Sequence, residues 1–166
     1  MVSSYISKWP GKSAYDGQPE HPAVYHMLDV AAVAELLLAP CDFSRARRAA
    51  LVLLIGLHDL GKVGDGFRGM IRNGVSQGLR HWELTEVWLL YDAVLRERLG
   101  ADGHVWRALV GAIAGHHGRP SAQDERYFST YRAAAGMEAA RDVPIIAADM
   151  HALWPDASLA GVKRAE

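Results

Sequence analysis

Residues 49–62 read Ala-Ala-Leu-Val-Leu-Leu-Ile-Gly-Leu-His-Asp-Leu-Gly-Lys, and the rest of the chain can be interpreted around this segment. Its first nine residues are almost wholly apolar, which is typical of a central, buried helix. We expect this helix to run from Arg45 to Leu60, with Ser44 as its cap and Gly61 closing it. Such a helix presents His58 and Asp59 at its end, where helical geometry no longer constrains the second side chain.

The remaining sequence predicts further helices, and strand-like alternation is absent. The expected helices are Pro22–Leu38, Trp82–Leu99, His104–His116, Val143–Leu153 and a weakly patterned Gln123–Met137. Between residues 61 and 80, six glycines interrupt regular structure, so we expect a loop with one short helix at Phe67–Arg72. The prediction is an all-α fold: a compact, globular helical bundle with a Gly-rich loop near the active site.

Length and composition indicate one domain. The chain has 166 residues, of which 50% are apolar, enough for one real core. Its formal net charge is −1, so binding to nucleic acid would require a local basic patch. Residues 1–20 lack periodicity and are interpreted as an N-terminal arm.

Cysteine content and hydropathy bear on the compartment. The one cysteine, Cys41, cannot form an internal disulfide, which fits a reducing environment. The N-terminus lacks a hydrophobic signal region, and the apolar runs are far shorter than the ~20 residues that a membrane span needs. We therefore expect a soluble, cytoplasmic protein with no membrane partner.

The candidate chemistry lies in histidines and acidic residues at several separate sites. His58-Asp59 is the first, and Gly115-His116-His117-Gly118 is the second. His26 lies on the first predicted helix, and His81 follows the Gly-rich loop. Asp149 lies within an apolar run, where an ionised carboxylate is costly unless it is paired or bound to metal. The candidate metal ligands are therefore His26, His58, Asp59, His81, His116, His117 and Asp149.

Each site alone also has an ordinary interpretation, such as a capped helix, a polar loop or a buried histidine. Together they supply enough nitrogen and oxygen ligands for one or two divalent ions, with positions left for water and phosphate. Two such ions can hold a phosphodiester and activate a water molecule. Lys62, just past the His-Asp pair, can neutralise a phosphate oxygen in the transition state.

The ordered set of motifs resembles the HD superfamily of metal-dependent phosphohydrolases. Within it, the sequence is most similar to the nuclease domain of the type I CRISPR-associated helicase–nuclease family. The resemblance extends from about Trp9 to Trp154 and includes the segments at 9–13 and 21–31, Phe67 and the Gly-His-His-Gly motif. HD alone is a weak signal, whereas the ordered set is specific.

The resemblance implies a helical nuclease that degrades single-stranded DNA with divalent ions, namely Mn, Fe, Co, Ni, Mg or Zn. It assigns His26, His58, Asp59 and Asp149 to one ion. It assigns His81, His116 and His117 to a second, with Asp59 bridging. Asp59 and Lys62 are implied as catalytic residues. The implied partners are a superfamily 2 helicase domain or subunit and the CRISPR RNA-guided surveillance complex.

The chain departs from the family pattern in two respects. The nuclease domain is commonly fused to a helicase, yet no Gly-x4-Gly-Lys-Ser/Thr pattern occurs here. We therefore interpret residues 1–166 as a single HD nuclease domain without a helicase domain. The segment between Gly118 and Asp149 is also short, which makes Asp149 the least secure ligand.

A local basic margin is the candidate DNA-binding surface. Lys62, Arg68, Arg72 and Arg119 are the candidate substrate-binding residues, and Phe67 and Trp82 are candidate stacking platforms. Ordinary surface charge and core aromatics explain the same residues equally well. Two alternative functions remain: an HD phosphohydrolase acting on nucleotides or cyclic nucleotides, and a binding module with a purely structural metal.

Overall fold

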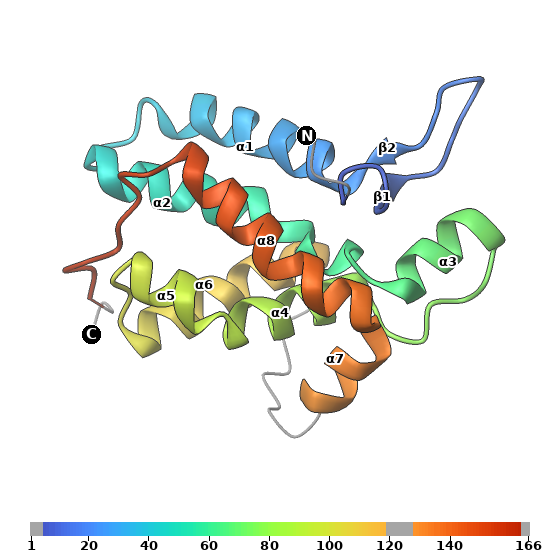
Figure 1. Cartoon of the computed structure of the whole chain (residues 1–166). Coiled ribbons are helices and arrows are strands. Elements are labelled where there is room, and N and C mark those ends of the chain that lie inside the picture. The colour runs from blue at the N-terminus through green and yellow to red at the C-terminus, as the bar shows by residue number, and fades with distance from the viewer. Residues whose placement is uncertain (1–4, 119–127, 164–166) are drawn as a thin grey trace.

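The computed structural model describes residues 5–118 and 128–163 as a bundle of helices with one small hairpin (Figure 1). The helices are α1 (Ala23–Leu38), α2 (Arg45–Gly56), α3 (Asp65–Asn73), α4 (His81–Tyr91), α5 (Ala93–Arg98), α6 (Gly103–Ala114), α7 (Phe128–Ala135) and α8 (Met137–Leu153). Two 3₁₀ turns, η1 (Leu57–Lys62) and η2 (Gly115–His117), follow α2 and α6. The strands β1 (Pro10–Lys12) and β2 (His21–Pro22) pair antiparallel. The predicted all-α fold is confirmed.

Helix α2 is largely buried, as its apolar sequence predicts. Val52, Leu53 and Leu54 are each no more than 1% exposed. On one side α2 packs against α1, and beyond its end η1 packs against α4. Burying these branched side chains supplies much of the stability of the fold, at ~1.5–3 kcal/mol each. The turn that carries His58 and Asp59 is therefore packed between α1 and α4.

Three predicted helix boundaries differ from the structure. The central helix ends at Gly56, because Asp59 adopts a non-helical φ of −110° and ψ of 21° within η1. The helix expected at Trp82–Leu99 is two helices, because the side chain of Asp92 caps α5 by accepting a hydrogen bond from the Leu95 N–H. The last helix, expected to begin near Val143, begins at Met137 and continues through an internal proline.

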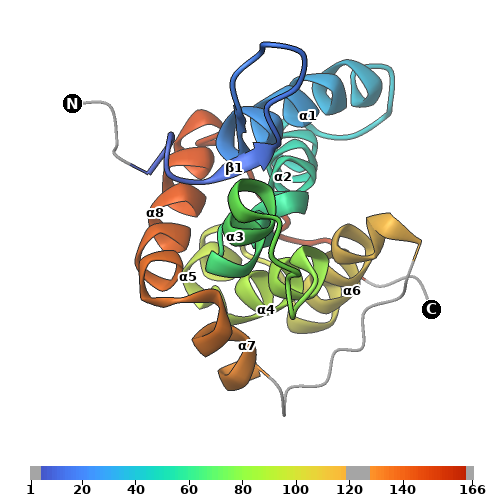
Figure 2. The same cartoon turned by 90° about the vertical axis from the view of Figure 1, so that its right-hand side faces the viewer.

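The N-terminal arm is part of the packed body. Trp9 is fully buried, and its indole N–H donates to a buried carboxylate of α8, Asp142, at 3.0 Å. Lys8 also contacts Asp142 at 3.0 Å. In Figure 2, β1 of this arm lies between α1 and α3, and it contacts both helices. An isolated sequence pattern could not predict this, because the partner of Trp9 is more than a hundred residues away in the chain.

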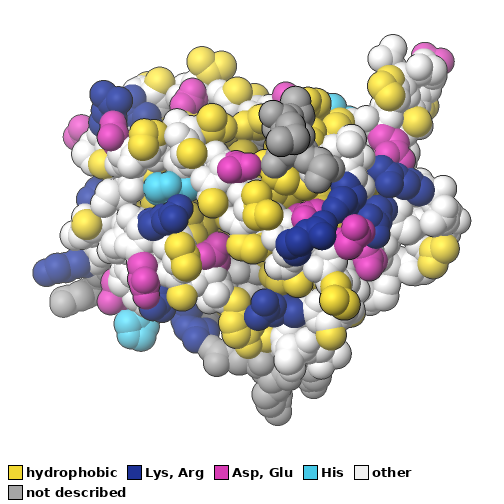
Figure 3. All heavy atoms as spheres, in the orientation of Figure 1, with side chains coloured by type: hydrophobic (Ala, Val, Ile, Leu, Met, Phe, Trp, Pro, Cys, Tyr) yellow, Lys and Arg dark blue, Asp and Glu magenta, His cyan; other side chains and the backbone are white. Residues whose placement is uncertain are grey.

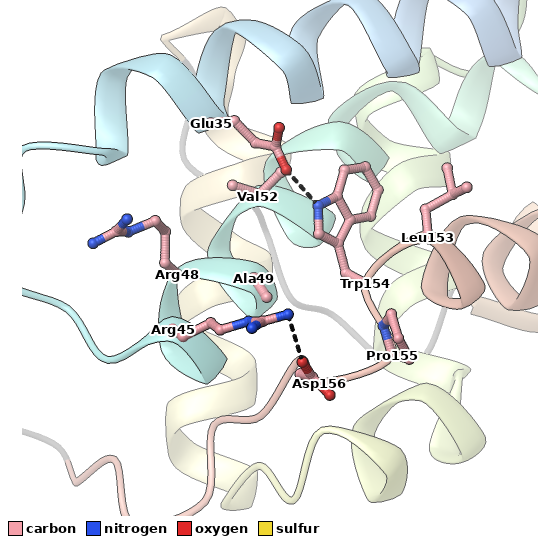
Figure 4. A pocket seen from close by; sticks show the side chains of 9 residues that line it. All are labelled: Glu35, Arg45, Arg48, Ala49, Val52, Leu153, Trp154, Pro155 and Asp156. Carbon is pink, nitrogen blue, oxygen red and sulfur yellow. Dashed lines mark hydrogen bonds and ion pairs between the residues drawn. The ribbon is translucent and has the colours of Figure 1, made fainter.

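At the opposite end of α2 from His58, a hollow of about 460 Å³ lies between α1, α2 and the end of α8 (Figure 4). Trp154 donates its indole N–H to Glu35 at 2.8 Å, and Arg45 pairs with Asp156 at 3.1 Å. These polar groups of the hollow therefore bind one another. In the part of the chain that the structure describes, no helix has the length and apolar character needed to cross a membrane.

Candidate metal centre

The turn η1 places Asp59 inside the protein. Its backbone is fixed to α4, because the Gly61 N–H donates to the hydroxyl of Thr85 at 2.9 Å. With the helix ended at Gly56, the non-helical backbone at Asp59 turns its side chain away from solvent, and the residue is 3% exposed. The sequence predicted that the helix would end near this residue and free its side chain, and the structure has this arrangement.

Several nitrogens surround the carboxylate of Asp59. Its Oδ2 lies 2.9 Å from Nε2 of His26, 3.1 Å from Nε2 of His58 and 2.7 Å from Nζ of Lys62. Its Oδ1 lies 3.4 Å from Nε2 of His81 and 3.5 Å from Nε2 of His116.

These residues form two sets of candidate ligands that share Asp59. We call His26, His58 and Asp59 the first ligand group, and Asp59, His81, His116 and His117 the second. Within each group, the candidate ligand atoms all lie within 4.8 Å of one another. Two groups joined by one carboxylate can hold two neighbouring cations.

Backbone carbonyls orient two of the imidazoles. Nδ1 of His58 lies 3.0 Å from the carbonyl oxygen of Ile55, and Nδ1 of His116 lies 2.8 Å from that of Ile113. When a cation is bound, each Nδ1–H can donate to its carbonyl, and the lone pair of each Nε2 is then left for the cation. This is the outer-shell arrangement that fixes the tautomer of metal-binding histidines.

The site suits a cation better than it suits hydrogen bonds alone. Oδ1 of Asp59 is buried and makes no hydrogen bond to the described residues, although imidazole nitrogens lie nearby. Buried polar atoms are normally satisfied, so an orphaned carboxylate oxygen facing imidazoles indicates a missing partner. Imidazole nitrogen with carboxylate oxygen is a ligand set for divalent first-row transition ions.

The electrostatics of the site keep Asp59 ionised. Burial alone would raise the pKa of the Asp59 carboxyl, but hydrogen bonds from the two imidazoles of the first ligand group and from Lys62 outweigh burial. They hold its pKa far below the usual range. Asp59 is therefore a permanent anion at the junction of the two groups.

His81 has the opposite behaviour and gives a testable pH dependence. Burial lowers the pKa of His81 to about 4, despite the nearby charge of Asp59. Between about pH 6.5 and that value, the unfolded chain binds a proton that the folded chain excludes. The free energy of unfolding of the metal-free protein should therefore fall, by up to ~3 kcal/mol, as the pH is lowered through this window.

Urea unfolding in EDTA at several pH values measures this dependence. The variant His81→Gln should have a flatter profile above pH ~4 than the parent, because it removes the titrating group. Burial also lowers the pKa of His116, which contributes a slope of the same sign. Equal slopes for parent and variant would show that His81 does not carry the effect.

Asp149 is not brought to the cluster. It lies exposed on α8, and its carboxylate accepts a hydrogen bond from the hydroxyl of Tyr5. It belongs to neither ligand group. The buried acidic residue of this helix is instead Asp142, which the sequence analysis did not single out and which binds the N-terminal arm. The sequence signal for the burial of Asp142 was its position on α8, next to Val143 and four residues before Ile146, both of which are buried.

The predicted basic margin is largely engaged within the protein. Arg68 pairs with Asp65 at 2.7 Å and Glu138 at 3.0 Å. Arg72 pairs with Glu20 at 2.9 Å. In Figure 3, basic and acidic side chains are intermixed on this side of the molecule. These contacts hold α3 to the arm and α8, while Arg119 lies outside the described residues.

The two predicted stacking aromatics differ. Phe67 is 5% exposed and packs against the ring of His81, so its predicted role as a platform for bases is wrong. Trp82 is partly exposed, with its ring centroid 4.8 Å from that of His117. Trp82 therefore remains available beside the second ligand group. Trp88 and Trp106, in contrast, are buried in the core.

Comparison with known proteins places the chain in a family. The family described as "Cas3, HD domain" matches residues 9–160. Among curated proteins, the CRISPR-associated endonuclease/helicase Cas3 of Thermus thermophilus is 33% identical over 137 aligned positions. That match covers 68% of this chain and 15% of the relative.

Solved structures agree on the fold. The crystal structure of T. fusca Cas3 superposes with a TM-score of 0.70 at 17% identity, covering 90% of this chain and 20% of that one. The Thermus thermophilus Cas3 HD domain, crystallised in the presence of Ni²⁺, superposes with a TM-score of 0.65 at 22% identity, covering 91% of this chain and 66% of that one. This chain spans less than two thirds of the length of the first relatives it matches.

Proposed function

Because the chain belongs to the family of Cas3 HD domains, we propose that it is a divalent-metal-dependent nuclease that hydrolyses phosphodiester bonds in single-stranded DNA. The observation that carries the proposal is the sharing of Asp59 between two ligand groups. A shared carboxylate suits a pair of cations at the spacing that phosphodiester hydrolysis uses, which is about 3.5–4 Å.

The two ligand groups would bind the ions, and Lys62 would bind the substrate. The first and second ligand groups would hold the ions, which supply an activated water and stabilise the leaving oxygen when bound. Lys62 has its Nζ 2.7 Å from Asp59 and a side chain only 10% exposed. Its ammonium is thus held at the junction of the two groups, where it can contact a phosphate oxygen.

The open side of the site favours a polymer over a small nucleotide. His116 and His117 are exposed, whereas Asp59 and His81 are buried beneath them. Next to His117, Trp82 is partly exposed and has the guanidinium of Arg80 at 5.5 Å from its ring. A base stacked on Trp82 would place its backbone near the cationic groups, as in sequence-tolerant single-strand binding.

The proposal extends to the proteins with which this domain acts. The curated relative is named an endonuclease/helicase, and this chain matches 15% of it. We therefore infer that the domain acts with a superfamily 2 helicase domain or subunit, which supplies the single strand. The further partner is the CRISPR RNA-guided surveillance complex, whose displaced DNA strand would be the substrate.

A cleavage assay on circular single-stranded DNA tests the proposal. Metal-free protein should be inactive, and addition of Mn, Fe, Co, Ni, Mg or Zn in turn should identify ions that restore cutting. His58→Ala should lose this activity, whereas His104→Ala, which changes an exposed histidine of α6 outside both ligand groups, should retain it.

The choice of a circular substrate reveals internal cutting, because a circle has no ends. Hydrolysis of mononucleotides or cyclic nucleotides without any cutting of DNA would instead support the alternative phosphohydrolase. Equal activity of His58→Ala and the parent would show that the proposed centre is not the active site.

A further inference from the structure

We propose that an apolar groove beside the metal centre binds one nucleoside of the DNA strand, next to the phosphate that is cut. The groove has a volume of about 400 Å³ and lies between α1, α2 and α6. This inference rests on the proposed nuclease function and adds to it a site for the substrate. The lining residues are Val30, Leu51, Leu54, Ile55, His58, Leu109, Ala112, Ile113 and His116.

The groove ends at the metal centre. Two of its lining residues are His58 and His116, one from each ligand group. Their ring centroids are 5.0 Å apart, with an interplanar angle of 79°. Because the Nε2 atoms of both rings face Asp59, the same two rings border the ligand groups and the groove. A phosphate held at the ligand groups would therefore have its nucleoside within reach of the groove.

The chemistry of the lining suits a base and sugar and excludes a phosphate. Apart from the two imidazoles, every lining side chain is aliphatic, and none is Lys or Arg. The groove can thus desolvate the faces of a base, while the backbone phosphates must remain outside it. Aliphatic walls cannot hydrogen-bond to base edges, so this site would accept any base, as a nuclease without sequence preference requires.

The size of the groove favours a nucleoside over a partner protein. Small-molecule sites begin at about 300 Å³, so this volume suits one nucleoside and is small for the face of a docking helix. Leu36 and Leu37, which are 76% and 69% exposed further along α1, are not among the lining residues. The groove is therefore distinct from the exposed apolar end of that helix.

An oligonucleotide with one abasic residue tests the inference. The parent protein should cut a phosphodiester beside an intact nucleoside about 10-fold faster than the same bond beside the abasic residue, because only the intact nucleoside buries apolar surface in the groove. Ala112→Trp, which fills the groove from its rim, should cut both bonds at similar, reduced rates. Ala32→Trp, on the exposed face of α1 and outside the lining, should behave like the parent.

The outcomes separate this inference from the proposed function. If the parent cuts DNA but does not distinguish the abasic bond on either side, the inference is overturned and the nuclease function stands. If Ala112→Trp retains full discrimination, the groove does not hold the nucleoside. If that variant cuts normally but no longer binds a helicase subunit, the groove is a protein interface. A parent that cuts no DNA with any ion overturns both.

Discussion

Asp59→Asn is expected to lose both metal ions and reduce DNA cleavage by more than ~100-fold. This exceeds the ~10–100-fold loss in affinity or activity that follows removal of an outer-shell partner, because Asp59 belongs to both ligand groups. Asparagine keeps the shape of the side chain but removes its charge. Its amide would also present N–H donors to imidazole nitrogens that should instead face a cation.

Metal analysis after gel filtration measures this effect directly. The parent should carry up to two equivalents of Mn or Ni, and Asp59→Asn should carry almost none. His26→Ala and His117→Ala each change one ligand group, so each should lose one equivalent and retain the other. A variant at Asp59 that binds as much metal as the parent would show that the two groups are not a metal centre.

Asp149→Asn is the matched control for this experiment. It makes the same chemical change to an exposed carboxylate that belongs to neither ligand group. We expect it to retain metal and activity, and to lose at most the hydrogen bond from Tyr5. If it instead lost metal as Asp59→Asn should, Asp149 would be a ligand, as the family resemblance implies.

The sequence was sufficient to predict the elements that bring the ligands together. The apolar run before His58 required a buried helix, and a histidine and an aspartate at the end of such a helix must face the interior or terminate it. The helix expected to end at His116 ends at Ala114, and η2 follows it directly. These predictions depended on local pattern alone, which is why they agree with the structure.

Asp149 lies away from the predicted metal site because the face that a helix buries depends on its tertiary contacts. The apolar run around it suggested a buried position, yet burial on α8 follows Val143, Ile146, Ala147 and Met150. Asp149 lies one residue from this stripe, about 100° around the helix. The buried face of α8 is set by its start at Met137 and by the N-terminal arm that packs on it, and the local sequence shows neither.

The basic margin shows the same limit for charges. Arg68 and Arg72 are close to the metal centre in sequence, which suggested contact with DNA. Their carboxylate partners, Glu138 and Glu20, come from distant segments that no local pattern connects with α3. Whether an arginine is free or paired depends on the fold, so the sequence left two interpretations open.

Gly61→Ala should destabilise the protein by at least ~3 kcal/mol, at the upper end of the usual cost of overpacking. A Cβ at residue 61 would lie 1.8 Å from the carbonyl oxygen of His81 and 2.5 Å from the amide nitrogen of Thr85. Both atoms are backbone of α4, so neither can rotate away. The turn η1 would have to separate from α4 and break the hydrogen bond from Gly61 to the Thr85 hydroxyl.

The separation would also move the metal centre, because η1 carries Asp59 and Lys62 while α4 begins with His81. We therefore expect Gly61→Ala to lower the melting temperature by roughly 6–12 °C for a chain of this size and to weaken metal binding at the second ligand group. Gly69→Ala is the matched control: it lies inside α3, and a Cβ there meets no atom within 4 Å. That change should leave metal binding intact and stabilise the helix by about 0.5–1 kcal/mol. If the two variants melted at the same temperature, the close contact between η1 and α4 would not be what holds the two halves of the site together.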